Sequence, residues 1–294
     1  MLRWRLLLGT LIVAVLVGLC WVDARSNGSG VWLLPVALIA AVLATGEMLA
    51  LLAAAGLRPA PAVVYAANLL VTLSGWTPWL AARKSLPGGP GAALALEVAA
   101  VAVAVLAVFF AEMWRYRKPG HAIANLAGGI LAIVYIGFML RFAIWLRLSY
   151  GIGALAVWII VVKMGDTGAY TVGRLFGRHK MAPAISPGKT IEGAAGAFLF
   201  ACLSSWLAFQ FLVPFAVTST TTTGPVYGWL VFGLLVGGVG MLGDLAESLL
   251  KRDVGVKDSS TWMPGFGGVL DILDSLLLSA PVAWFCFEFG LAGR

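Results

Sequence analysis

Residues 92–113 read AALALEVAAVAVAVLAVFFAEM, and Glu97 and Glu112 are the only charged side chains in this stretch. A continuous apolar run of about 20 residues is long enough to cross a bilayer as a helix. Similar runs recur along the chain, in which 61% of the residues are hydrophobic and only 11% are charged. A soluble domain would carry about 25% charged residues. The sequence therefore predicts an all-α polytopic integral membrane protein.

Polar and turn-forming breaks divide the apolar runs into nine predicted transmembrane helices, with eight as the alternative count. Breaks such as Pro87-Gly88-Gly89-Pro90-Gly91 are typical of segments that end helices. Basic residues are retained on the cytoplasmic side, and an N-terminus inside leaves most of the 20 Lys and Arg residues there. The predicted spans are residues 6–22, 31–55, 62–80, 92–113, 122–140, 149–165, 191–213, 226–247 and 270–290.

Polar chemistry is concentrated in the second half of the chain, because most of the 13 carboxylates lie at or after Asp166. We therefore expect residues 1–120 to form N-terminal transmembrane helices with little polar chemistry. Residues 121–294 are expected to form C-terminal transmembrane helices that carry an active site on the cytoplasmic face.

Asp166 lies at the end of a predicted span. A carboxylate at that depth is costly unless it holds a cation or pairs with a basic group. The sequence leaves both readings open: Asp166 is a candidate metal ligand, or it forms an ion pair with Lys163 or Arg174.

The run Ser186-Pro187-Gly188-Lys189-Thr190 precedes a predicted span. It is not a P-loop, because that motif needs a preceding strand and a Gly where this chain has Pro183 in surroundings expected to be helical. A Gly-Lys-Thr at a helix start still offers backbone N–H groups, an ammonium and a hydroxyl to a phosphate. We therefore predict Ser186, Lys189 and Thr190 as anion-binding residues.

Asp244 and Ser248 are one helical turn apart at the end of a predicted span, and Asp271 and Asp274 have i, i+3 spacing at the start of the last one. Clustered carboxylates repel one another unless a cation neutralises them, and ligands with only oxygen donors suit Mg²⁺. The alternative is capping of a helix N-terminus, which is acceptable for one of the aspartates. The sequence therefore predicts a magnesium site.

Lys251, Arg252 and Lys257 lie between these carboxylates. Carboxylates that hold a divalent cation, beside basic groups that hold phosphates, indicate phosphoryl or nucleotidyl transfer. The net charge of +7 suits a membrane surface with anionic lipid. It does not indicate nucleic acid as a partner, because no soluble basic domain is expected.

Two blocks of sequence carry a resemblance to a known family. The upstream block includes Asp166-Thr-Gly-Ala-Tyr170 and Ile185-Ser-Pro-Gly-Lys-Thr190. The downstream block is Ser248-x-x-Lys251-Arg252-x4-Lys257-Asp258, followed by Pro264-x-x-Gly267-Gly268-x-x-Asp271-x-x-Asp274. In this order the blocks resemble the signature of the phosphatidate cytidylyltransferases, also called CDP-diacylglycerol synthases. The first half of the chain matches only as a run of membrane helices.

The resemblance implies transfer of a cytidylyl group from CTP to phosphatidate, giving CDP-diacylglycerol and pyrophosphate, in a cell inner membrane with the active site facing the cytoplasm. Its expected partners are CTP, phosphatidate and membrane lipid, and the oligomeric state stays open, with a homodimer as one option. The expected cofactor is Mg²⁺, held by Asp166, Asp244, Asp271 and Asp274. The three aspartates Asp244, Asp271 and Asp274 and the lysine Lys257 are the expected catalytic residues. The expected substrate-binding residues are Ser186, Lys189, Thr190, Ser248, Lys251 and Arg252.

Two departures from the family pattern affect these expectations. Phe266 stands where the family usually has His, and Ile272 stands where it usually has Arg. The remaining carboxylates and lysines favour a divergent but active enzyme. The alternatives are a related lipid or polyprenol phosphotransferase or kinase, an ion-coupled transporter, and a catalytically silent homologue.

Overall fold

The computed structural model describes residues 2–26, 30–82, 89–212, 225–260, 262–263 and 267–292. The chain forms two compact units. Unit 1 contains residues 1–145 and 258–271, and unit 2 contains residues 146–257 and 272–294. Packing therefore separates the chain near residue 145. The division expected at residue 120 rests on where polar residues lie and stays a prediction.

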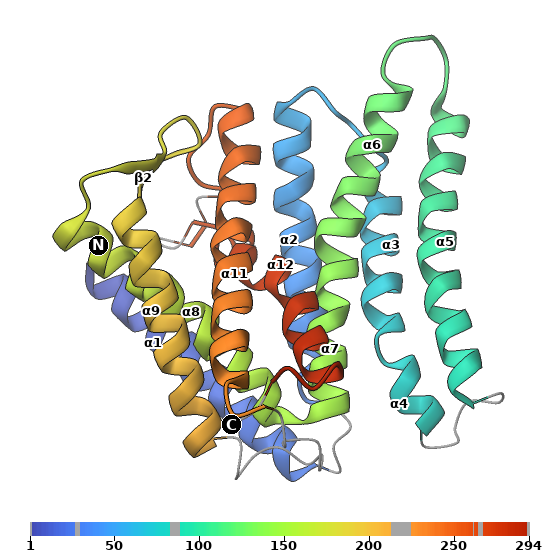
Figure 1. Ribbon diagram of the computed structural model, residues 1–294. Coiled ribbons are helices and arrows are strands. Elements are labelled where there is room, and N and C mark those ends of the chain that lie inside the picture. The colour runs from blue at the N-terminus through green and yellow to red at the C-terminus, as the bar shows by residue number, and fades with distance from the viewer. Residues whose placement is uncertain are drawn as a thin grey trace. The chain divides into compact units, whose positions relative to one another are not determined.

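Helices make up most of both units (Figure 1). Within the described ranges, seven helical segments are long and apolar enough to cross a membrane. The predicted polytopic helical membrane architecture is thus confirmed, while the count of nine spans and the inside N-terminus stay predictions. The seven segments are Leu34–Ala54, Gly91–Arg115, Ala122–Tyr150, Ile152–Phe176, Ile191–Leu212, Gly228–Asp253 and Val269–Glu288.

Unit 1 is built from helices that follow one another in the sequence. They are α1 (Leu2–Arg25), α2 (Leu34–Ala54), α3 (Pro61–Ser74), α4 (Thr77–Ala82), α5 (Gly89–Arg115), α6 (Ala122–Ala132), the π-helical segment η1 (Ile133–Phe138) and α7 (Met139–Tyr150), which belongs to unit 1 up to Trp145.

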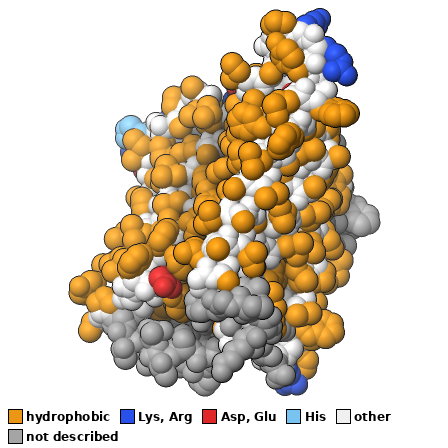
Figure 2. Space-filling model, turned by 90° about the vertical axis from the view of Figure 1, so that its right-hand side faces the viewer, with side chains coloured by type: hydrophobic (Ala, Val, Ile, Leu, Met, Phe, Trp, Pro, Cys, Tyr) orange, Lys and Arg blue, Asp and Glu red, His pale blue; other side chains and the backbone are white. Residues whose placement is uncertain are grey.

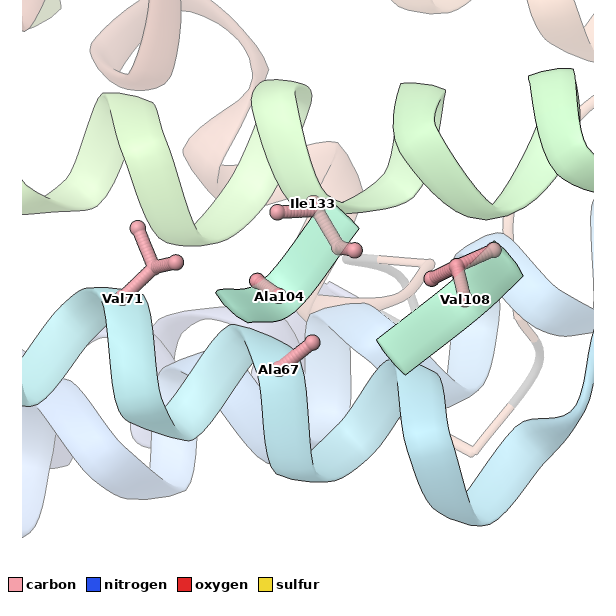
Figure 3. Close-up of a cluster of buried hydrophobic side chains, with 5 residues drawn as sticks. All are labelled: Ala67, Val71, Ala104, Val108 and Ile133. Atoms are coloured by element: carbon pink, nitrogen blue, oxygen red, sulfur yellow. The ribbon is translucent and has the colours of Figure 1, made fainter. Parts of the chain in front are cut away.

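The core of unit 1 lies where α3 packs against α5 and η1. Figure 3 shows that Ala67 and Val71 from α3, Ala104 and Val108 from α5, and Ile133 from η1 point toward one another. All five are almost completely buried. Alanine at two of the positions lets the helices approach closely, which favours helix packing in a bilayer.

The prediction of a single helix over residues 62–80 is wrong. The helix α3 ends at Ser74, and the short α4 begins at Thr77. At the break, the Ser74 hydroxyl donates to the Val71 carbonyl at 2.7 Å and the Thr77 hydroxyl donates to the Ser74 carbonyl at 2.8 Å. Pro78 lies in the first turn of α4, where proline is favoured because no N–H is needed there.

The break expected between residues 140 and 149 lies further along the chain. The helical segment Ala122–Tyr150 is continuous, and the chain turns at Gly151. Gly151 has a φ of 89°, in the left-handed region that glycine adopts without strain. The next helix, α8 (Ile152–Phe176), is longer than predicted. Asp166 therefore lies inside a helix and not at its end.

Unit 2 is built around three long helices that pack against one another: α8, α9 and α11. Its elements after α8 are β1 (Lys180–Ala182), β2 (Ser186–Thr190), α9 (Ile191–Leu207), the π-helical segment η2 (Ala208–Leu212), α11 (Gly228–Asp253) and α12 (Val269–Glu288), which belongs to unit 2 from Ile272 onward.

A small antiparallel hairpin, formed by β1 and β2, precedes α9. Apart from this small hairpin, the described residues have the predicted helical character, whereas the prediction of helical surroundings at Pro183 is wrong. Pro183 and Pro187 cannot donate the backbone hydrogen bonds that a continuing helix requires. The hairpin places Lys189 and Thr190 directly before the first turn of α9.

Glycines bring α8 and α9 into close contact. A Cβ at Gly168 would lie 2.5 Å from the Gly196 carbonyl oxygen, and a Cβ at Gly196 would lie 2.5 Å from the Cβ of Val172. Only glycine fits at such distances. By contrast, a Cβ at Gly165 would meet nothing closer than 3.7 Å.

Among the described residues, the face that Figure 2 shows is mostly apolar, with Lys and Arg side chains near its upper and lower ends and an acidic side chain in its lower part. On α5, which lies at the right of Figure 1, Leu94, Val98, Phe109 and Phe110 are exposed. An apolar surface of this extent on helices is expected for a protein that faces lipid.

We predict that Gly168→Ala destabilises the protein by about 1–3 kcal/mol, because the added methyl group overpacks the α8–α9 contact. Thermal unfolding in detergent measures the effect. Gly165→Ala is the matched control on the same helix, since its methyl group has ordinary contact distances. Equal melting temperatures for the two variants would contradict the close packing.

Candidate active site

A cavity of about 400 Å³ in unit 2 is lined by α8, the β1–β2 hairpin, α9 and α11. Glycine and alanine residues form much of its wall, and their small size leaves room for a ligand. Five of the predicted site residues line this one cavity, and Arg174 joins them. The lining residues with charged or hydroxyl groups are Asp166, Tyr170, Arg174, Ser186, Lys189, Thr190 and Asp244.

Lys189 and Asp244 form an ion pair in the cavity wall. The Lys189 ammonium lies 2.8 Å from the Asp244 carboxylate, and the side chains are 18% and 38% exposed. Lys189, which was predicted to bind phosphate, is thus paired with Asp244, which was predicted to bind a metal ion. The pair presents one positive and one negative group to whatever enters the cavity.

Thr190 is the N-cap of α9. Its hydroxyl accepts the backbone N–H of Gly193 at 3.0 Å, as expected for a threonine with extended backbone at a helix start. Next to it, the Glu192 carboxylate accepts the backbone N–H groups of Arg178 and His179. These contacts fix the hairpin to the start of α9, and they hold the neighbouring Lys189 at the cavity.

Lys163 of α8 connects that helix to α12. Its ammonium donates to Asp166 at 3.1 Å, to the Ile272 carbonyl at 3.0 Å and to the Ser275 hydroxyl at 3.0 Å. The Ser275 hydroxyl is also 3.0 Å from the Asp166 carboxylate. Of the two readings of Asp166, the ion pair with Lys163 is confirmed. The role of Asp166 toward a metal stays a prediction.

Asp274 is buried on α12, and its carboxylate accepts the Ser275 backbone N–H. It interacts electrostatically with Asp244, Lys163 and Asp166. Asp274 is therefore close enough to two other predicted metal ligands, Asp166 and Asp244, to interact with them electrostatically. Lys163 is the cation next to Asp274. The sequence offered Lys163 only as a partner for Asp166, and its contacts to α12 follow from tertiary packing.

Ser248 and Lys251 follow Asp244 on α11. The Ser248 hydroxyl lies 3.5 Å from the Asp244 carboxylate. Lys251 is buried and forms an ion pair with Glu247 one turn earlier. Neither residue belongs to the cavity lining within the described part of the chain. Their substrate-binding roles stay predictions.

Arg252 and Lys257 lie at and beyond the end of α11, and both are exposed. The Arg252 guanidinium donates to the Ile185 carbonyl at 3.3 Å and to the Val256 carbonyl at 2.9 Å. It therefore connects the end of α11 to the turn of the hairpin. Lys257 is the last residue of this part of unit 2.

Asp271 belongs to unit 1, whereas the other three predicted metal ligands belong to unit 2. Its Oδ2 atom accepts the backbone N–H of Gly268 at 2.7 Å and that of Ser259 at 2.9 Å. The first of these bonds is the capping interaction that the sequence left as an alternative for one aspartate. Phe266 lies outside the described residues.

The carboxylates of unit 2 fit a magnesium ion that also binds substrate. Among the described residues, no group of three or more His, Cys, Asp or Glu side chains is arranged to hold a metal ion by itself. Mg²⁺, however, is usually bound by one or two carboxylates and completes its octahedron with phosphate oxygens and water. Asp244 and Asp274 supply such a pair of oxygen donors.

Comparison with known proteins agrees with the two sequence blocks. The model of the Cytidylyltransferase family matches residues 3–289. The phosphatidate cytidylyltransferase of Haemophilus influenzae is 39% identical over 142 residues, which cover 48% of this chain and 48% of that protein. That of Bacillus subtilis is 38% identical over 157 residues, covering 53% and 55%, and that of Mycobacterium bovis is 36% identical over 168 residues, covering 57% and 52%. The chain thus spans about half the length of the curated relatives it matches.

We predict that Thr190→Val lowers the free energy of unfolding by about 1 kcal/mol, because it removes the capping oxygen of α9. Unfolding in mixed micelles measures the loss. Thr190→Ser keeps the oxygen and should stay close to wild type. A Thr190→Val protein as stable as Thr190→Ser would contradict the capping role.

Proposed function

Because this chain belongs to the Cytidylyltransferase family, we propose that it transfers a cytidylyl group from CTP to phosphatidate, giving CDP-diacylglycerol and pyrophosphate. The observation that carries the proposal is the cavity in unit 2. There Lys189, from the upstream block that resembles this family, pairs with Asp244, which lies four residues before the downstream block begins at Ser248.

The reaction brings two polyanions together. A phosphate oxygen of phosphatidate attacks the α-phosphorus of CTP, a new P–O bond forms, and the bond to the leaving pyrophosphate breaks. No general base is needed, because the lipid phosphate is ionised near neutral pH. Lys189 and Arg174 line the cavity and supply positive charge to the triphosphate, while Ser186 and Thr190 supply hydroxyl groups.

Asp244 and Asp274, with Asp166, are the residues of unit 2 that would hold Mg²⁺. When bound, the ion neutralises phosphate charge and polarises the P–O bonds. Lys189 has a second task in this arrangement, because its ion pair orients the Asp244 carboxylate. Lys163 orients Asp166 in the same way.

We place the protein in the cell inner membrane with the cavity toward the cytoplasm, so that CTP enters from water and the lipid enters from the bilayer. Two features support this orientation. The hairpin next to the cavity begins with the basic residue Lys180 and follows Arg174 and Arg178, as the positive-inside rule requires of a cytoplasmic segment. Leu175 and Phe176, at the end of α8, are exposed apolar side chains suited to a lipid contact.

The proposed function is tested with purified protein in detergent, labelled CTP, phosphatidate and Mg²⁺. We expect CDP-diacylglycerol and pyrophosphate in equal amounts, and no product when EDTA removes the metal. Transfer of the γ-phosphate of a nucleotide to a lipid alcohol instead would identify a kinase and reject the proposal.

We predict that Lys189→Met lowers kcat/KM by about 10²–10³-fold, the usual cost of removing one group that stabilises the transition-state charge. Lys180→Met removes the same charge from the exposed neighbouring strand and should leave turnover unchanged. Steady-state rates at saturating Mg²⁺ compare the two variants. Equal losses would show that only the overall charge of the hairpin matters.

A further inference from the structure

A buried carboxylate from the first half of the chain contacts the downstream signature segment. Glu47 lies within α2, and only 7% of it is exposed. Its Oε1 accepts the indole N–H of Trp262 at 3.0 Å and the backbone N–H of Val269 at 2.9 Å. Its Oε2 accepts the Ser259 hydroxyl at 2.8 Å and the backbone N–H of Leu270 at 2.7 Å. Four donors therefore converge on one carboxylate, all within unit 1.

These donors explain how a carboxylate is tolerated in an apolar helix. A charge at membrane depth is costly unless hydrogen bonds or an opposite charge compensate it. The N–H groups of Val269 and Leu270 belong to the first turn of α12, where the positive end of the helix dipole favours a negative charge. Glu47 thus caps α12 from another helix.

The hydroxyl of Ser259 links Glu47 to Asp271. It lies 2.8 Å from Glu47 Oε2 and 2.7 Å from Asp271 Oδ2. Since a hydroxyl has a single hydrogen, the Ser259 hydroxyl is shared between the two carboxylates and donates to one of them at a time. Asp271 also accepts the backbone N–H groups of Ser259 and Gly268. The orientation of Asp271 therefore depends on a segment that Glu47 holds in place.

The carboxylates of Glu47 and Asp271 explain why the downstream sequence block has two consecutive glycines, Gly267 and Gly268. A Cβ at Gly268 would collide with Glu47 Oε2 and with the Ser259 hydroxyl oxygen. Gly267 has a φ of 80°, and a Cβ there would collide with Asp271 Oδ2. Both positions require glycine because these carboxylates and Ser259 fill the space where a side chain would lie.

We propose that Glu47 is a positioning residue for the reaction: it fixes Ser259 and the start of α12, and through them it sets the orientation of the Asp271 carboxylate, one of the metal ligands predicted from the sequence. This inference rests on the proposed function for its catalytic consequence. The first half of the chain thus holds a polar residue that contacts the downstream signature segment, although composition gave it little chemistry.

The test is Glu47→Gln, which keeps the size of the side chain but turns one acceptor oxygen into a donor. We expect kcat to fall and the Mg²⁺ concentration for half-maximal rate to rise, each by about 10- to 100-fold, as for other residues that orient a metal ligand. The KM for CTP should change by less than about twofold, because the triphosphate contacts in unit 2 are intact. Amide hydrogen exchange in residues 259–270 should be faster than in wild type.

Glu97→Gln is the matched control. Glu97 is also a buried carboxylate of unit 1, and it accepts the Thr77 hydroxyl at 3.0 Å, away from the signature segment. This variant should keep the wild-type kcat and Mg²⁺ requirement. If Glu47→Gln does not fold, Ser259→Ala removes only the shared hydroxyl and should show the same changes at smaller size.

The proposal is rejected if Glu47→Gln keeps the wild-type kcat and Mg²⁺ requirement, or if Glu97→Gln shows the same losses. Should the wild-type protein make no CDP-diacylglycerol, the proposed function fails, and hydrogen exchange alone decides the positioning role. Unchanged exchange in residues 259–270 would then reject it.

Discussion

Compensation of charge inside an apolar protein is the constraint on which the polar parts of this structure depend. Only 11% of the residues are charged, and a charge away from water is tolerated only with a partner. Lys189 pairs with Asp244, and Lys163 pairs with Asp166. Glu47 uses the N–H groups at the start of α12 instead of a cation. The chemistry of the protein is thus built from the same contacts that make its charges tolerable.

The helical membrane architecture could be predicted because hydropathy is a property of a whole segment, which single residues do not overturn. The residues at which the helical segments end were harder to predict. The break at Gly151 depends on one residue with positive φ, and the gap between α3 and α4 depends on hydroxyl groups that satisfy the free carbonyls. The hairpin before α9 was missed because its strands are only three and five residues long and are mostly polar or small, so that no apolar alternation marks them.

Within the site, the sequence located residues but not their partners. The spacing of Ser186, Lys189 and Thr190 indicated a phosphate-binding helix start, and the structure places all three at one cavity with Asp244. Glu47 has no such spacing pattern, because it is a single carboxylate in an apolar run and Ser259, its hydroxyl donor, lies 212 positions away. A different rule, that ionisable residues within a membrane span are candidates for function, would have singled it out. Only tertiary packing shows which segment it holds.

Compensation of charge also matters at Ile272, where related sequences usually have an arginine. Loss of that cation removes positive charge from the second turn of α12, next to the buried Asp274. The structure places the Lys163 ammonium at this turn, 3.0 Å from the Ile272 carbonyl and 3.0 Å from the Ser275 hydroxyl. A lysine on α8 therefore supplies positive charge where the α12 side chain has none. Because Lys163 also pairs with Asp166, one ammonium balances two of the carboxylates that surround it.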